Sequence, residues 1–441
     1  MKLRALRVPA EPAATLAALR IAVPALVLMA PGLREGVRVA ALDPHLRVAP
    51  EGLGWFLAIA PVSADLALVV ELVTAFAALL AIAGVRARPA LVVMTLGAFY
   101  LNALAQTTGQ VWHDMHLLWL AALLAASPCD HALAYDARAP ARDSAAYGLP
   151  LGFARLLLGA VYFFPGFHKL HSSGLAWALS DNLRNQIYWT WAEHGALPAF
   201  RIDEHPWLLH TGGLFVLAFE LGAPILFLVP RTRVLGALCG IAFHLLAQAI
   251  FLIPFISLWG CYVVLFDMRP LDARVRRWRG GADGVALVPE RHTLRAPFVV
   301  GALLLAGVAI QGVRGQMQSY PFACYPTFQW IVGTEMPDLR IFAVSADGAA
   351  HELPFARYAR GYRTQRQWGT IWSLALGGSE ERLRAYYMYV TRFEPARSLA
   401  RGAVRARFVR AYVSVLPVER GAAPVREETI VEIALAPIVT P

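Results

Sequence analysis

The sequence predicts a mainly α-helical polytopic membrane protein of eight or nine transmembrane helices, with a small C-terminal β-rich domain on the non-cytoplasmic face. Three observations predict this fold class. Hydrophobic residues make up 58% of the 441 residues and charged residues only 16%, whereas soluble proteins average about 45–50% and about 25%. The apolar residues gather in runs long enough to cross a bilayer. The C-terminal part instead alternates apolar and polar residues, which is typical of strands.

Separate apolar runs approach the roughly 20 residues that span a bilayer. They are residues 13–31, 66–84, 89–106, 113–127, 151–168, 207–229, 234–253, 255–267 and 296–313. The first contains Arg20 and the eighth is short, which is why we expect eight or nine spans. Lys2, Arg4 and Arg7 precede the first run, as they would precede a secretion signal. No small-x-small cleavage site follows, so we favour an anchor over a signal.

Basic residues lie in alternate connections between these runs, which predicts the orientation. They gather in the N-terminal segment, at 86–88, at 138–142, at 231–233 and in 269–295. Because Lys and Arg are enriched in cytoplasmic loops, we expect the N-terminus in the cytoplasm and the C-terminal domain outside it. Of the 40 cationic side chains only Lys2 and Lys169 are lysines, so arginine carries almost all of this topological signal.

The chain divides into a transmembrane domain, residues 1–313, and an extracytoplasmic domain, residues 314–441. Asp347-Gly348 is a hairpin turn signal between two short strand patterns. Further strands are expected at 404–418 and 425–437, and a helix at 379–392.

Ionisable residues inside the runs are functional candidates, because a bilayer makes them costly. They are Glu71, His113, Asp114, His116, Arg155, Glu220 and His244, with Lys169 at the end of a run. Ordinary structural roles also suit them. Glu71, Arg155 and Glu220 suit mutual ion pairs. Asp114 and His116 suit a helix cap, and His244 suits one interior hydrogen bond.

The densest polar site is Tyr-Phe-Phe-Pro-Gly-Phe-His-Lys-Leu-His, residues 162–171. We expect Pro165-Gly166 to distort the helix end, so that His168, Lys169 and His171 emerge at the outer face. The alternative is a lysine that reaches to the membrane interface. Arginine serves as the cation elsewhere in the chain, and a buried lysine can lose its proton and act as a base, whereas guanidinium cannot. These arguments favour a chemical role for Lys169.

Apolar residues recur every four positions through Gly174–His194, and Trp177 adds an interfacial aromatic side chain. The pattern predicts an amphipathic helix that lies on the outer leaflet and covers the Lys169 site. A simple connecting helix is the alternative.

Several function classes lack their motifs. The chain has no P-loop, Rossmann glycine pattern, HExxH or CxxC, and its four cysteines show no ligand spacing, so we expect no metal. Topology accounts for the arginines, so we expect no nucleic-acid partner.

Three stretches resemble the vitamin K-dependent gamma-carboxylase family and its bacterial relatives, the HTTM (horizontally transferred transmembrane) domain proteins. Gly-Phe-His-Lys-Leu at 166–170, followed by Trp177, resembles the family's Gly-x-x-Lys-Leu segment. Phe243-His244 resembles its Phe-His membrane segment, and Trp112-His113 resembles the entry to another helix. The resemblance implies that Lys169 is the catalytic base and deprotonates reduced vitamin K or another quinol. It further implies that the quinol, with oxygen, drives carboxylation of a peptide or protein glutamate and forms an epoxide. The resemblance also implies that the quinone pocket is formed by His113, His168, His171, Trp177 and His244.

One stretch departs from the family pattern. Where carboxylases carry a Trp-x-Met-Met-like segment, this chain reads Tyr320-Pro-Phe-Ala-Cys-Tyr-Pro-Thr-Phe328. Two functions therefore stay open, a quinol-dependent carboxylase (a carbon–carbon lyase) and a non-carboxylating maturation or binding factor with a lipid or quinone pocket. A transporter is weaker, because the polar residues form no repeat-related pathway. Membrane lipids are partners in each case.

Overall fold

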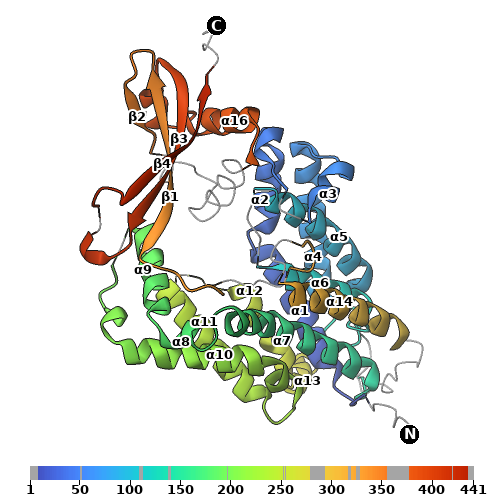
Figure 1. The fold of residues 1–441 in the computed structure, drawn as a ribbon. Helices are drawn as coiled ribbons and strands as arrows, with labels where there is room; N and C mark the ends of the chain where they lie inside the picture. The colour runs from blue at the N-terminus through green and yellow to red at the C-terminus, as the bar shows by residue number, and fades with distance from the viewer. Residues whose placement is uncertain are drawn as a thin grey trace.

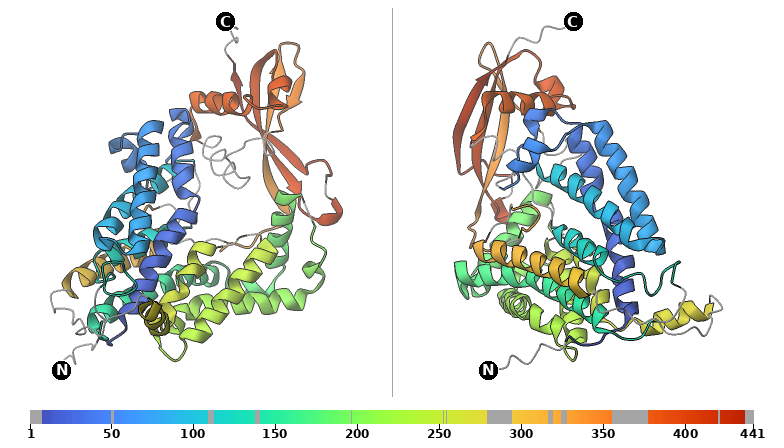
Figure 2. Two further views of the ribbon diagram at one scale, coloured as in Figure 1. Left: turned by 180° about the vertical axis from the view of Figure 1, so that it is seen from behind. Right: turned by 90° about the vertical axis from the view of Figure 1, so that its right-hand side faces the viewer.

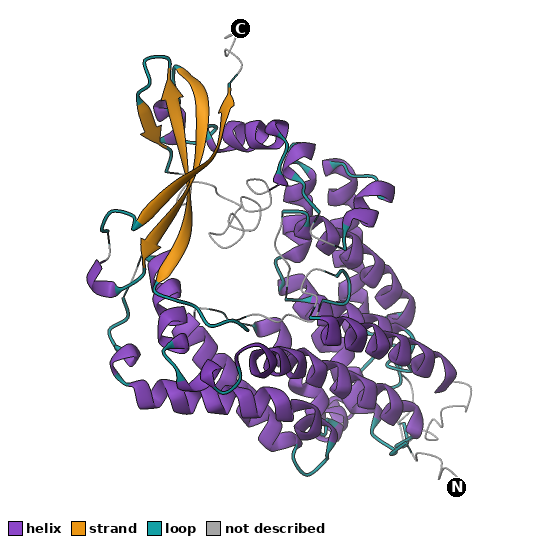
Figure 3. Ribbon diagram, in the orientation of Figure 1, coloured by secondary structure: helices purple, strands orange, loops and turns teal. Residues whose placement is uncertain are grey.

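The protein is mainly helical and carries one small antiparallel sheet near its C-terminus (Figure 3). The computed structural model describes residues 8–49, 52–108, 113–137, 141–195, 197–251, 253, 255–278, 294–315, 319–323, 328–354, 377–419 and 421–435. The sheet lies at one end of the helical body, and the start of helix α1, Ala13–Met29, lies at the other (Figures 1 and 2).

The N-terminal helices form one group, coloured blue to cyan in Figure 1. They are α1 Ala13–Met29, α2 Gly32–Ala40, α3 Gly54–Ile59, α4 Ala64–Ala83, α5 Ala87–Gln106 and α6 Met115–Ala125. The boundaries of α4 follow local chemistry. The Ser63 hydroxyl accepts a hydrogen bond from the Leu66 amide at its start, and Gly84 ends it at φ 75°.

A second group of helices follows, coloured from green through yellow to orange in Figure 1. They are α7 Ala145–Ser173, α8 Ala176–Leu179, α9 Asn182–His194, α10 Pro206–Leu228, α11 Arg233–Phe251, α12 Ile256–Trp259, α13 Arg269–Trp278 and α14 Arg295–Arg314. Short 3-10 helices add η1 Pro44–Leu46, η2 Ile202–Glu204 and η3 Gly260–Leu265. Helix α10 packs along α7, and α11 packs beside α10.

Seven helices in the described part of the chain are long and apolar enough to cross a membrane. The predicted fourth and eighth runs form shorter apolar helices, Met115–Ala125 and Ile256–Leu265. Apolar side chains on α4 are widely exposed, among them Leu72 at 62% and Phe76 at 64%. Such a surface suits hydrocarbon and not water, so the chain is an integral membrane protein.

Two local predictions were wrong. Pro165 and Gly166 do not end or visibly interrupt the helix, because α7 continues through them to Ser173. Lys169 therefore sits within the helix and not on a loop beyond it. The expected single helix over 174–194 is broken between α8 and α9, where Ser180 is extended.

The sheet has the order β2-β1-β3-β4, with all pairs antiparallel. Its strands are β1 Glu335–Ser345, β2 Ala350–Glu352, β3 Ala403–Ser414 and β4 Arg426–Ala434, and it is accompanied by α16 Glu380–Val390, α17 Ala396–Leu399 and η5 Pro417–Glu419. These elements confirm the expected hairpin, strand pair and helix. Gly348 has a φ of 88° in the turn between β1 and β2, which glycine adopts without strain.

The hydrophobic core of the sheet also receives a residue from the N-terminal helices. Leu46 of η1 is 2% exposed and packs into the cluster that contains Ile341, Phe408 and Tyr387. The connection between α2 and α3 therefore anchors the sheet to the helical body.

Candidate functional site

A cavity of about 530 Å³ lies among α7, α8, α9, α10, α11 and α12. Its walls are mostly apolar, with Phe215, Phe243 and Phe251 among the aromatic contributors. The polar side chains on its lining are His113, Tyr162, Lys169, Gln186, Thr211, Glu220 and His244. An apolar cavity with a few convergent polar groups is the usual form of a small-molecule site.

Lys169 and Glu220 form a buried ion pair at this cavity. The Lys169 Nζ atom donates to Glu220 Oε1 at 2.5 Å, and the two side chains are 6% and 4% exposed. The same Nζ atom lies 5.0 Å from the centre of the Trp177 ring, within cation–π range. The only lysine in the body of the chain thus contacts a carboxylate and an aromatic face.

The local sequence of α7 explains how the pair comes together. Tyr162, Pro165 and Lys169 are spaced by three and four residues, so they share one face of the helix, and all three line the cavity. A side chain on Gly166 would place its Cβ 2.7 Å from the Glu220 Cβ atom. Glycine at this position therefore lets α10 approach α7 closely enough for the carboxylate to reach Lys169.

A second polar group on the cavity is a hydrogen-bonded chain of three side chains. The Tyr162 hydroxyl lies 2.6 Å from His244 Nε2 and 2.5 Å from the Tyr262 hydroxyl. His244 is 2% exposed, and its Nδ1 atom has no partner among the described residues. The second oxygen of Glu220, Oε2, is likewise buried without a partner there. Buried polar atoms usually have partners, so both are available to a ligand.

His113 and Trp177, which the family resemblance assigned to a quinone pocket, also line this cavity. The His113 ring packs edge-on against Phe255, with ring centres 5.8 Å apart. Trp112 lies outside the described residues. Beside His113, the Ser257 hydroxyl donates to Asp114, and His116 bridges the carbonyl oxygens of His113 and Ser257.

His168 and His171 lie on other faces of α7 and are not among the described residues that line the cavity. His168 is buried, with Nε2 2.7 Å from the Gly312 carbonyl oxygen of α14. His171 is exposed and stacks on Phe167 at 5.7 Å between ring centres. The structure thus brings Lys169, His113, Trp177 and His244 together and separates the other two histidines from them.

Sequence reasoning missed the segment 328–333, which crosses α7, α8 and α9. The Trp177 Nε1–H donates to the Phe328 carbonyl oxygen at 2.5 Å, and the Ser173 hydroxyl donates to that of Gln329. Farther along the segment, the Asn185 side-chain amide donates to the Val332 carbonyl oxygen and the Trp189 Nε1–H donates to the Gly333 carbonyl oxygen. Phe328 itself lines the cavity. No local pattern marks this segment, because its role depends on contacts with distant helices.

The predicted ion pairs among Glu71, Arg155 and Glu220 were wrong. Glu220 pairs with Lys169, and Arg155 pairs with Glu11 through two hydrogen bonds of 2.5 and 2.7 Å. Among the described residues, no group of three His, Cys, Asp or Glu side chains is arranged to hold a metal ion.

The sequence model of the HTTM domain family matches residues 9–268, which is more than half of the chain. This range contains α7, α10 and α11 and thus Lys169, Glu220 and His244. No curated protein and no solved structure was found to match the chain.

Proposed function

This chain belongs to the HTTM domain family, and we propose that it is a quinol-dependent membrane enzyme of the vitamin K-dependent carboxylase type. Lys169 is its catalytic base, and the cavity on α7, α10 and α11 is its quinol site. The single observation that carries the proposal is that Lys169 is buried in an apolar cavity of a membrane protein. Arginine is the common cation of this chain, yet the described residues of the cavity lining include none.

The cavity suits an aromatic substrate with two oxygen functions. Lys169 and Glu220 provide one polar point, and His244, held by Tyr162, provides another. Phe215, Phe243 and Phe251 supply apolar surface for the ring and an attached chain. The volume of about 530 Å³ lies within the range of small-molecule sites.

The residues of the chain would perform the first proton transfer. The Lys169 amine takes a proton from the quinol hydroxyl, and the resulting ammonium stays beside the oxyanion and stabilises it in a low dielectric. The apolar walls exclude water, which protects a strongly basic species from quenching. The reduced quinone supplies, with oxygen, the base that removes a proton from glutamate before carbon dioxide adds.

The expected orientation accompanies this proposal. The basic connections between the spans support a cytoplasmic N-terminus and an extracytoplasmic sheet, with a peptide or protein glutamate reaching the cavity from the side of the sheet.

A non-carboxylating lipid- or quinone-binding factor is the second candidate. It is favoured by the segment that begins at Tyr320, which packs inside the bundle. The Tyr320 hydroxyl donates to the Phe99 carbonyl oxygen, and the Trp119 Nε1–H donates to the Pro321 carbonyl oxygen. This region lacks the family's paired methionines.

The test is turnover by the purified protein in lipid nanodiscs with a reduced naphthoquinone, bicarbonate and a glutamate-containing peptide. Lys169→Ala and Lys169→Arg should each lower epoxide formation by about 10²- to 10⁴-fold, the usual contribution of a positioned base. Arg34→Ala, at an exposed position, is the control. Epoxide formation that survives both lysine substitutions contradicts the proposal. Quinol binding without epoxide or carboxylated peptide in the wild type favours the second candidate.

A further inference from the structure

We propose that Glu220 is a second catalytic residue of the cavity, which takes up the proton that Lys169 holds at rest and so frees the amine to act as a base. The inference rests on the proposed function and identifies the partner of its base. A lysine can abstract a proton only after it has lost its own, so the resting proton needs an acceptor.

The geometry points to Glu220 as that acceptor. The Nζ and Oε1 atoms are 2.5 Å apart, within hydrogen-bond distance, and a hydrogen bond between an ammonium and a carboxylate is charge-assisted. Within the part of the chain that the structure describes, Glu220 is the only carboxylate on the cavity lining. Transfer of a proton along this bond replaces two buried charges by two neutral groups, which removes the cost of keeping two ions in a low dielectric.

The second carboxylate oxygen supports a role beyond charge neutralisation. Oε2 is buried and has no partner in the described residues, although a purely structural carboxylate would normally have both oxygens satisfied. It faces the Gly166 position of α7, where a Cβ atom would come within 3.2 Å of it. One oxygen of Glu220 therefore holds Lys169, and the other is free to carry a proton or to contact a ligand.

The proton balance closes without a further reactant. In the first step an N–H bond of the Lys169 ammonium breaks and an O–H bond forms on Glu220. In the second step the quinol O–H bond breaks and a new N–H bond forms on Lys169. The result is a quinol oxyanion beside an ammonium and a neutral carboxylic acid. The net charge of the site and its ligand is the same before and after.

The alternative is that Glu220 only neutralises Lys169 and stays ionised throughout. The two roles differ in one measurable quantity, the protonation state of the Glu220 carboxyl when quinol is bound. Infrared difference spectroscopy reports this state directly, because a protonated carboxyl has its own carbonyl stretching band. The readout needs binding of the quinol but no turnover.

The experiment compares wild type, Glu220→Gln, Glu220→Asp and Glu71→Gln in nanodiscs, with and without a reduced naphthoquinone. Glu71 is the matched control, since it is a half-exposed carboxylate of α4, outside the described cavity lining. We expect a protonated-carboxyl band on quinol binding in wild type and Glu71→Gln, shifted in Glu220→Asp and absent from Glu220→Gln. Turnover should fall at least about 100-fold in Glu220→Gln and be partly restored in Glu220→Asp.

The outcomes separate this inference from the proposed function. A bound quinol that produces no such band, or a band that persists in Glu220→Gln, overturns the role of Glu220 and leaves Lys169 as the base. A band without epoxide formation in the wild type supports Glu220 and overturns the carboxylase proposal. A quinol that does not bind overturns both. Thermal unfolding of each variant detects loss of the fold. If Glu220→Gln does not fold, the presence or absence of a shifted carboxyl band in Glu220→Asp decides whether Glu220 takes up the proton.

Discussion

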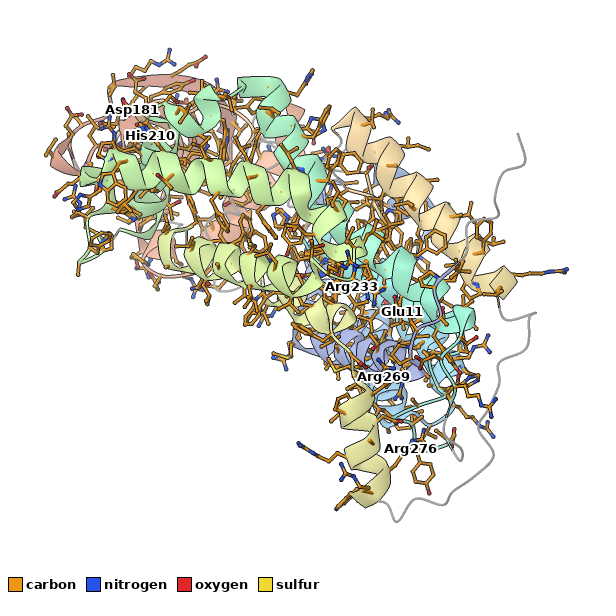
Figure 4. The ribbon with its side chains drawn as sticks, turned by 90° about the horizontal axis from the view of Figure 1, so that it is seen from below. Glu11, Asp181, His210, Arg233, Arg269 and Arg276 are labelled. Atoms are coloured by element: carbon orange, nitrogen blue, oxygen red, sulfur yellow. The ribbon has the colours of Figure 1, made fainter. Side chains whose placement is uncertain are left out.

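Glu11 and Arg155 are 144 positions apart in the sequence, yet both carboxylate oxygens of Glu11 accept hydrogen bonds from the Arg155 guanidinium, at 2.5 and 2.7 Å. Arg233 at the start of α11 contacts the same carboxylate at 3.1 Å, and Figure 4 shows Glu11 beside Arg233. Arg155 also donates to the Val264 carbonyl oxygen. One carboxylate thus joins the N-terminal segment to α7 and α11, the helices that carry Lys169 and His244.

We expect Glu11→Gln to destabilise the protein by about 3–5 kcal/mol, because it leaves two guanidinium groups close together without their carboxylate. The measurement is the free energy of unfolding in detergent. Glu380→Gln, which breaks an exposed pair with Arg384, should change that free energy by no more than about 1 kcal/mol. A loss in Glu11→Gln that is no larger than the loss in Glu380→Gln would contradict the stabilising role of the buried cluster.

Gly166→Ala should push α7 and α10 apart, because the added Cβ atom would lie 2.7 Å from the Glu220 Cβ atom. Overpacking of this kind costs about 1–3 kcal/mol, and the Lys169–Glu220 bond should lengthen, so turnover should fall as well. Gly152→Ala in the same helix is the control, since its Cβ atom would meet nothing within 4 Å. Unfolding and turnover assays on both variants test this. A Gly166→Ala variant that behaves like Gly152→Ala would refute the close-approach argument.

Tyr162→Phe removes the hydroxyl that joins His244 to Tyr262. Because both partners are then buried without that hydrogen bond, we expect a loss of about 1–3 kcal/mol in unfolding free energy. Quinol affinity should also fall, since the His244 ring is no longer held. Tyr135→Phe, at a residue that is 74% exposed, should leave both quantities unchanged. Unaltered stability and affinity in Tyr162→Phe would mean that the chain of three side chains does not order the cavity.

Acid should destabilise the loop before α10, because protonation removes the charge of the Asp203 carboxylate. Burial raises the pKa of this carboxyl, but hydrogen bonds from Arg201 and Tyr188 outweigh it and hold the pKa below its usual value of 3.8. A lowered pKa in the folded state means that Asp203 contributes stability above the unfolded pKa. This contribution is lost as the pH falls through the lower, folded pKa.

Hydrogen exchange of Ile202–Glu204 between pH 6 and pH 3 measures this effect, after correction for the intrinsic exchange rate. Protection should fall on acidification in the wild type. In Asp203→Asn it should be lower at pH 6 and independent of pH. A wild-type loop whose protection stays constant over this range would contradict the assignment.

Apolar runs were sufficient to predict most of the helices. Insertion of any long run of apolar residues into a bilayer is favourable whatever its tertiary contacts, so the seven long helices follow from the hydropathy of their segments. The hairpin at Asp347-Gly348 was also predictable, since the turn depends on a glycine at positive φ. The continuation of α7 through Pro165 was not predictable, because local propensity favours a helix end there and the packing of α7 against α10 and α14 is a tertiary contact.

The sequence by itself determined that this is a helical membrane protein and that Lys169 is its exceptional cation, because hydropathy and residue type are properties of each segment alone. Only the tertiary structure decided the partners. Glu220 reaches Lys169 because Gly166 lets two helices meet, and Arg155 turns instead to Glu11. His168 points to Gly312 and away from the cavity because a helix presents residues 168 and 169 on different faces. Contacts between distant segments depend on helix rotation and approach, and a linear sequence does not display either.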